Sequence, residues 1–270
     1  MKKGLMIALL LLTFSRYAIA QATIADIREQ IAKGECETAQ SLYNVYRAMN
    51  GANKTIEREI ADCKSGSSSG FGEIGIADGH EYVDLGLPSG TLWATCNVGA
   101  SKPEDYGSYF AWGETWTKGT YKWETYMHAE GEYDKLTKYC DRTDQGYNGF
   151  TDNLATLLPE DDPATANWGS GWRMPSKVQW DELLDNTTNY WTTKNGVKGR
   201  FFTSKKNSQT LFLPAAGCRW GSELYNGGYY WSRSLVTPNY AWRLNFGSDE
   251  CSMDYYFRYY GFNVRPVREK

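Results

Sequence analysis

A Ser/Gly-rich stretch at residues 64–72, KSGSSSGFG, separates two parts of the chain whose apolar residues repeat with different periods. Such a run is typical of a flexible linker, because glycine and serine carry too little apolar surface to fix a conformation. Before it, apolar residues recur with the helical period, and after it they fall in short strands between turns. The sequence therefore predicts a helical N-terminal segment over residues 21–63, a linker over 64–77 and an α+β domain over 78–270.

The N-terminal segment has the apolar spacing of short amphipathic helices. Isoleucines recur at i, i+3 and i+7 from Ile24, and the spacing returns in a second run that Asn50 and Gly51 end. A third short helix is expected to carry Ile56 and Ile60. The inward positions of the first two helices are predicted to be Ile24, Ile27, Ile31, Leu42, Val45, Tyr46 and Met49.

Residues 1–20 have the pattern of a cleaved secretory signal: two lysines, a short apolar run and an A-x-A arrangement before Gln21. The apolar run is much shorter than the roughly 20 residues that span a bilayer, so no membrane span is expected after cleavage. Cleavage removes three basic and no acidic residues, which changes the formal net charge from -3 to -6. An acidic exported protein is predicted, in the periplasm, at the cell surface or outside the cell, and nucleic acid is excluded as a partner.

The cysteine count is even, which in an exported chain permits disulfides. Cys36 and Cys63 border the predicted helical segment, so they are predicted to form a disulfide that closes it. The pairing of the other four is left open, between further disulfides and buried free thiols. No C-x-x-C occurs and the two histidines lie far from paired cysteines, so no metal or other cofactor is predicted. The remaining cysteines are Cys96, Cys140, Cys218 and Cys251.

Two hairpins and one helix are expected in the C-terminal domain. Residues 82–85 and 91–96 flank a Pro-Ser-Gly turn, and residues 200–204 and 210–213 flank a Lys-Asn-Ser turn. Between the hairpins, Ser176 caps a helix whose inward stripe begins at Trp180. The last third returns to strands, at residues 229–232, 241–246 and 262–267.

Several blocks of the C-terminal domain, taken together and in order, resemble the Fibrobacter-type major paralogous domain of secreted bacterial proteins. The resemblance spans nearly all of residues 78–270. It is carried by DLGLPSGTLWATCNVGA (84–100), YGSYFAWGET (106–115), ANWGSGWRMPSKVQWDELL (166–184), LPAAG (213–217), YYWSRS (229–234) and GFNVRPVR (261–268).

That family is similar to the C-type-lectin-like fold of the formylglycine-generating enzymes. The resemblance implies a C-type-lectin-like domain with short antiparallel strands and long loops. Enzymes of that fold hold copper with paired active-site cysteines, and other members hold iron with histidines. This chain matches neither pattern, because Cys218 and Cys251 are isolated in sequence and His80 and His128 are too few. The chain is therefore predicted not to be an enzyme.

Residues 218–262 hold 14 aromatic residues among 45, about twice the share of 15% in the whole chain. A core needs some of these rings, but it does not easily accommodate so many hydroxyl groups. Tyrosine and arginine among glycine, serine and asparagine are typical of adaptable binding surfaces, and aromatic faces also stack on sugar rings. The alternative reading is that these tyrosines only cover the edge of a small sheet.

The sequence thus predicts a secreted or surface recognition module that binds a glycan or a protein through aromatic-rich loops, with a role such as adhesion. Two other functions remain open: a divergent enzyme of the formylglycine-generating fold, and a structural surface or fimbrial component. Strand alternation assigns Trp242 and Phe246 to the core. The predicted ligand contacts are Tyr225, Tyr229, Tyr240, Tyr255, Tyr256, Arg258 and Tyr259.

Overall fold

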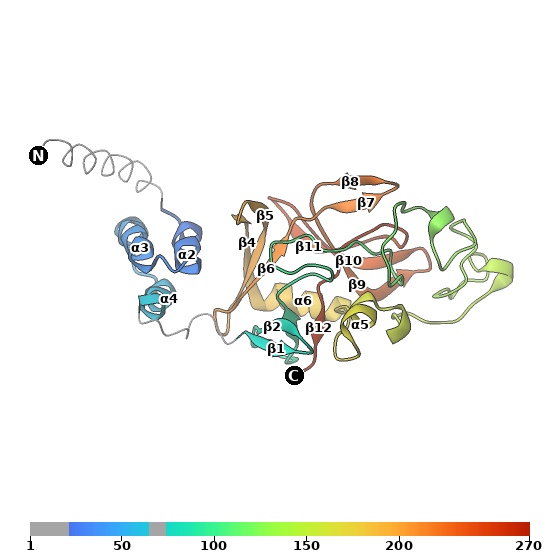
Figure 1. Ribbon diagram of the computed structural model, residues 1–270, viewed down its shortest axis with the longest axis horizontal. Coiled ribbons are helices and arrows are strands. Elements are labelled where there is room, and N and C mark those ends of the chain that lie inside the picture. Colours follow the sequence, from blue (N-terminus) through green and yellow to red (C-terminus); the bar gives the residue numbers. More distant parts are fainter. Residues whose placement is uncertain (1–21, 65–73) are drawn as a thin grey trace, which may run out of the picture. The chain divides into compact units, whose positions relative to one another are not determined.

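The computed structural model describes residues 22–64 and 74–270, and the chain divides into two compact units between residues 72 and 73 (Figure 1). The predicted signal, residues 1–20, lies outside the described residues, as does most of the predicted linker. The bounds predicted for that linker, 64–77, need correction at both ends. Lys64 is the last residue of a helix, and Gly75–Ala77 is a paired strand.

The N-terminal unit contains the three predicted helices. The side chain of Thr23 accepts a hydrogen bond from the backbone amide of Asp26, and the carboxylate of Asp26 accepts one from the backbone amide of Thr23, which forms a capping box. The second helix ends before Gly51, whose φ of 84° lies in the left-handed region that glycine tolerates. The helices are α2 (Ile24–Ala32), α3 (Cys36–Asn50) and α4 (Lys54–Lys64).

The core of this unit is small and differs in one place from the predicted stripe. Met49 is 69% exposed, whereas Tyr43 is buried and donates a hydrogen bond to Glu57 at 3.0 Å. The face of α3 that meets α4 therefore lies nearer its centre, and Met49 falls in the last turn beyond the contact. The fully buried apolar residues are Ile27, Ile31, Ala39, Tyr43, Ile56 and Ile60.

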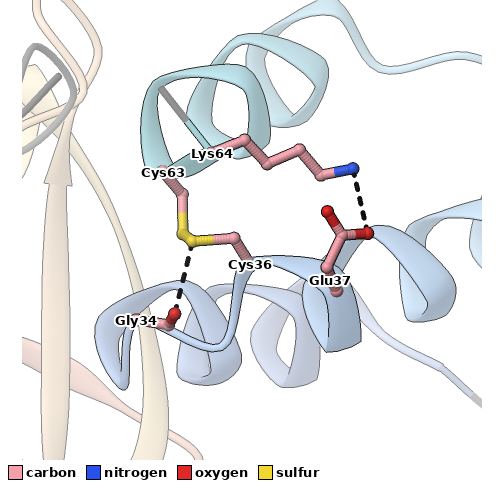
Figure 2. Close-up of a disulfide and its surroundings, with 5 residues drawn as sticks. All are labelled: Gly34, Cys36, Glu37, Cys63 and Lys64. Carbon is pink, nitrogen blue, oxygen red and sulfur yellow. Dashed lines mark hydrogen bonds and ion pairs between the residues drawn. A yellow bond between two sulfur atoms is a disulfide. The ribbon is translucent and has the colours of Figure 1, made fainter. Parts of the chain in front are cut away.

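The predicted disulfide between Cys36 and Cys63 is confirmed (Figure 2). It joins the first residue of α3 to the last turn of α4, with the two Cα atoms 5.6 Å apart. Beside it, Lys64 Nζ lies 3.3 Å from Glu37 Oε2, so an ion pair links the same two helix ends. The bond closes a loop that contains most of the unit.

The C-terminal unit is an α+β domain in which every strand pairing is antiparallel. One sheet has the order β1-β2-β3-β12, a second β11-β10-β9, a third β4-β5-β6, and β7 pairs with β8. The strands are β1 (Gly75–Ala77), β2 (His80–Asp84), β3 (Leu92–Ala94), β4 (Thr187–Lys194), β5 (Val197–Ser204), β6 (Thr210–Pro214), β7 (Cys218–Trp220), β8 (Glu223–Tyr225), β9 (Gly228–Thr237), β10 (Tyr240–Phe246), β11 (Cys251–Phe257) and β12 (Val267–Arg268).

Helix α6 (Lys177–Asn186) begins where the sequence predicts, with Ser176 and Gln179 forming a capping box. It packs against β9, β10 and β11 (Figure 1). Trp180 and Leu183 face the core, where they meet residues of β5, β6, β9 and β10. The shorter helical segments are α5 (Pro163–Trp168), η2 (Trp123–Thr125), η3 (Tyr147–Gly149) and η4 (Pro159–Asp161).

A second core lies on the opposite face of β9 and β10. Trp231 and Ala241 point into it and meet Phe262, Phe110 and Trp112. The indole of Trp231 donates a hydrogen bond to Phe110 O at 2.8 Å, and the indole of Trp112 donates one to Ser232 O at 2.8 Å. The sheet β11-β10-β9 is therefore packed on both faces, which determines how its aromatic residues are distributed.

Both predicted hairpins are confirmed, as β2 with β3 and β5 with β6. The strand predicted over residues 262–267 is shorter than expected. Only Val267–Arg268 forms a strand, whereas Phe262 and Asn263 make single bridges to Phe110 and Tyr230. The segment changes partner along its length, so one continuous ladder does not form.

Candidate ligand-binding surface

Strand β11 carries much of the predicted contact region, which sequence analysis placed on loops. Its register with β10 pairs Trp242 with Tyr255 and Tyr240 with Phe257. Side chains alternate between the two faces of a strand, so these four rings share one face of the sheet. Tyr256 points to the opposite face. The sheet therefore divides the predicted contacts, and they do not form one surface.

The first face carries a continuous series of rings, which we call the aromatic row. Tyr255 is 48% exposed, and the other members are partly exposed. Consecutive ring centroids lie 5.8, 5.7, 4.5, 5.7 and 5.0 Å apart, so each ring contacts the next. Perpendicular and tilted pairs are favourable aromatic geometries at these distances. In order, the row consists of Trp242, Tyr255, Tyr240, Phe257, Tyr259 and Trp123.

One ion pair lies beside the aromatic row. Lys177, in the first turn of α6, lies 4.9 Å from the ring centroid of Trp242 and 2.5 Å from the carboxylate of Asp181. A second pair, Arg243 with Asp254 at 3.1 Å, lies on the opposite face of the same two strands. Each cation has a carboxylate partner, so these two pairs carry no net charge.

Two phenol hydroxyls of the row are free to bind. In the part of the chain that the structure describes, the hydroxyls of Tyr240 and Tyr255 have no hydrogen-bond partner. A phenol can both donate and accept a hydrogen bond. The row thus combines apolar ring surface with polar groups that a ligand can reach.

The opposite face of the sheet brings together Tyr229 and Tyr256, but around a side chain of the protein. The guanidinium of Arg243 lies 4.7 Å from the ring centroid of Tyr229, 4.3 Å from that of Tyr256 and 4.9 Å from that of Phe262. Arg243 is only 7% exposed. These rings already stack on a cation, so Tyr229 and Tyr256 are packing residues here and lie apart from the aromatic row.

Tyr225 lies on a third element, the short hairpin of β7 and β8. It is 39% exposed, and Trp220 and Leu224 on the same hairpin are 46% and 48% exposed. Its hydroxyl donates a hydrogen bond to Glu223 at 2.6 Å. The hairpin therefore presents a smaller apolar surface, which among the described residues meets the row only at Tyr259, through the rings of Trp220 and Tyr260.

Arg258 requires a correction, because it lies in the interior and is not available to a surface ligand. Its exposure is 0%, and its guanidinium donates hydrogen bonds to the hydroxyl of Tyr126 at 2.9 Å and to the backbone oxygens of Lys138, Tyr139 and Pro238 at 3.0, 3.1 and 2.6 Å. It also lies 5.0 Å from the ring centroid of Trp112. A buried charge needs such partners. Arg258 fixes the segment that carries Trp123 against the end of β11.

The structure adds three rings that sequence analysis did not assign to the surface. Trp242, which was assigned to the core, is only partly buried, whereas Phe246 is buried as predicted. Phe257 is part of the row through its cross-strand pairing with Tyr240. Trp123 reaches the row from more than 100 residues away in sequence, and no local pattern indicates this contact.

The groups that catalysis of the formylglycine type would require are dispersed. Cys218 and Cys251 are unpaired and belong to different cores. Burial raises the pKa of each thiol to about 11, so neither is a thiolate near neutral pH. His128 is buried, with its Nε2 2.8 Å from Gly113 O, and His80 stacks on Trp168. No group of three or more metal-ligating side chains occurs among residues 22–64 and 74–270.

No protein-family model, curated protein or solved structure matches the chain. None of the described helices is both long and apolar enough to cross a membrane.

Proposed function

We propose that this protein is an exported, non-catalytic recognition module and that its C-terminal domain binds a glycan through the aromatic row. The observation that carries the proposal is the row itself. Six rings follow one another in contact, and two of them bear unpartnered hydroxyls in the described part of the chain. Aromatic faces suit the C–H surface of sugar rings, and hydroxyls suit their polar rim.

A C-type-lectin-like fold is part of the same proposal. Its support is the series of sequence blocks from Asp84 to Arg268, together with the α+β architecture of residues 73–270. Export is supported by the Cys36–Cys63 disulfide, since such bonds persist in oxidising compartments. Cell fractionation would distinguish the three exported locations: the periplasm, the cell surface and the medium.

A glycan array probed with the purified protein, once with calcium and once with chelator, tests the proposal. Binding is expected, and Trp242→Ala and Tyr255→Ala should each strongly weaken it. The matched control is Tyr225→Ala, which removes an equally large exposed ring from β8 and should leave binding unchanged. Near-UV circular dichroism must show that all variants keep the native fold. Binding that survives both row substitutions would place the site elsewhere.

The hairpin of β7 and β8 favours a second function, as a subunit of a surface assembly. Trp220 and Tyr225 present exposed rings on one face of the hairpin, with centroids 6.1 Å apart, and Leu224 is exposed on its other face. Exposed apolar side chains of this kind are enriched where proteins meet. Trp220→Ser should then lower a concentration-dependent mass measured by analytical ultracentrifugation. A mass that equals the monomer at all concentrations would contradict this second function.

A further inference from the structure

We propose that the aromatic row binds an uncharged, linear glycan along its chain, through at least three consecutive sugar units, and that it does not read a terminal sugar. This inference rests on the proposed glycan-binding function and specifies its ligand. Three observations support it: the linear order of the rings, the ion pair beside Trp242, and the position of the free hydroxyls.

The rings lie in sequence along the direction of β11. The pair of Trp242 and Tyr255 is followed two residues further by the pair of Tyr240 and Phe257, a distance of about 7 Å along the strands. Tyr259 and Trp123 continue the series, with Tyr259 at 5.7 Å from Phe257 and nearly parallel to it. The row therefore offers three successive aromatic positions, each on the order of one sugar unit apart. A linear chain can contact all three, whereas a single sugar contacts one.

The charge pair beside Trp242 favours an uncharged ligand. Lys177 is bonded to Asp181 and already lies over Trp242, whereas the pair of Arg243 and Asp254 lies on the opposite face of the strands. An anionic glycan would have to compete with Asp181 for Lys177. A cationic glycan would have to compete with Lys177 for Asp181. An uncharged chain requires neither exchange, so it loses no ion pair on binding.

The free hydroxyls lie at the first two of these three positions. Tyr255 belongs to the first and Tyr240 to the second, with ring centroids 5.7 Å apart, and neither hydroxyl has a partner among the described residues. Tyr259, by contrast, shares side-chain hydrogen bonds with Tyr260 and Trp220. Polar recognition is therefore expected at the two sugar units nearest Trp242, and stacking alone at the end near Trp123.

Affinity electrophoresis with polysaccharides in the gel is the first experiment. The neutral probes are hydroxyethylcellulose, laminarin, arabinoxylan and galactomannan, and the anionic probes are alginate and polygalacturonate. At least one neutral polymer should retard the protein and neither anionic polymer should. Retardation should be equal at low and high salt, because no charge is screened. Trp242→Ala should remove the retardation, whereas Tyr225→Ala should not.

Calorimetry with oligosaccharides of the retarding polymer, from one to six units, then tests the linear arrangement. The dissociation constant should fall roughly tenfold or more between one and three units and change little beyond four. Tyr255→Phe, which keeps the ring and removes the hydroxyl, should weaken binding a few-fold, and Tyr255→Ala roughly tenfold.

The outcomes separate this inference from the function on which it rests. Equal affinity for one unit and for six would mean recognition of a terminal sugar, and retardation by the anionic polymers alone would mean a charged ligand. Either result overturns the inference but leaves glycan binding in place. Failure of every polymer, together with an empty glycan array, contradicts both and indicates a protein ligand.

Discussion

The N-terminal unit buries six apolar side chains and contains one disulfide, whereas the described part of the C-terminal domain fully buries five tryptophans and two arginines and keeps its four cysteines unpaired. The contrast follows from size. A unit of about 40 residues removes too little surface from water to be stable on its core alone, and a disulfide compensates by restricting the unfolded chain. A domain of nearly 200 residues has no such need.

The larger core allows what the smaller one cannot, namely the burial of charge. Arg258 donates to four oxygen atoms and lies against three aromatic rings. Arg265 is also fully buried and donates to Asn97 Oδ1 at 2.9 Å and to two backbone oxygens. Such contacts stabilise one arrangement of distant segments. In this domain the hydrogen bonds of the two buried arginines have the stabilising role that the disulfide has in the N-terminal unit.

Replacement of Arg258 by methionine is expected to have the largest effect. It leaves the Tyr126 hydroxyl and three backbone oxygens without their donor, which should lower the free energy of unfolding by about 4 kcal/mol. Urea unfolding followed by tryptophan fluorescence measures this, because all 11 tryptophans follow residue 92 and report only the C-terminal domain.

The matched control for Arg258→Met is Arg142→Met. Arg142 bonds to Asp144 at the surface, so its loss should change the unfolding free energy by no more than about 0.5 kcal/mol. Hydrogen exchange of α2 to α4 should be unchanged in both variants. Equal stability of the two variants would show that the buried arginine does not hold the domain together.

Removal of the disulfide should affect the other unit. The double variant Cys36→Ser, Cys63→Ser is expected to lose about 3 kcal/mol of stability in the N-terminal unit, because its unfolded chain is no longer closed over a sequence separation of 27 residues. Amides of α2 to α4 should then exchange rapidly with solvent, as measured by mass spectrometry.

The fluorescence transition of the C-terminal domain should be the same with and without this disulfide. Cys96→Ser is the control, since Cys96 is unpaired and partly exposed. It should leave the exchange of the three helices unchanged. A shift of the C-terminal unfolding transition in the disulfide variant would contradict the claim that the disulfide stabilises only the N-terminal unit.

The elements that the sequence predicts correctly carry local signals. The capping box of α6, the helical spacing of the N-terminal segment and the turn residues of both hairpins each depend on neighbours within a few positions. The cysteine pair was identifiable for the same reason, since both members border one short segment. Local sequence signals were therefore sufficient to predict the helices and disulfide of the N-terminal unit and the first elements of the domain, α6 and the two hairpins.

The surface required information that local patterns lack. Residues 251–257 are rich in tyrosine and carry two acidic neighbours, so they resemble a binding loop, yet pairing with β10 makes them a strand. Arg258 lies among tyrosines in the sequence, as a surface contact would. It is nevertheless buried, and it donates hydrogen bonds to backbone oxygens of residues more than 100 positions away. Trp123 joins the row through contacts with Phe257 and Tyr259 alone. Each of these positions is decided by tertiary contacts.

The next largest effect is expected from acid pH, which should destabilise the C-terminal domain more than the N-terminal unit. Burial, together with the nearby Arg258, lowers the pKa of His128 to about 4 in the folded domain, against about 6.5 when unfolded. Below the unfolded pKa the unfolded state binds the extra proton, so stability present at neutral pH is lost as the pH falls from about 6.5 to about 4. From pH 7 to 5 the expected loss is about 2 kcal/mol, measured by fluorescence.

His128→Gln should remove most of this pH dependence. Burial raises the pKa of Asp162 to about 6, which acts in the opposite direction, but the effect is common to both proteins and cancels in the comparison. The N-terminal unit contains no histidine. The hydrogen exchange of its amides, corrected for intrinsic rates, should therefore depend much less on pH. An unchanged pH dependence in His128→Gln would assign the effect to other groups.

The smallest effects are expected from the two helix caps, which are chemically alike in the two units. Thr23 and Ser176 each accept a bond from the amide three residues on, at 3.2 Å in both cases. Alanine at either position should cost about 1 kcal/mol. In the small unit this is a large part of the total, so Thr23→Ala should visibly increase hydrogen exchange throughout α2. In the domain, Ser176→Ala should shift only the urea midpoint, because the core still holds α6. If both variants instead raised exchange equally in their own helices, the stability of each helix would depend on its cap and not on the core behind it.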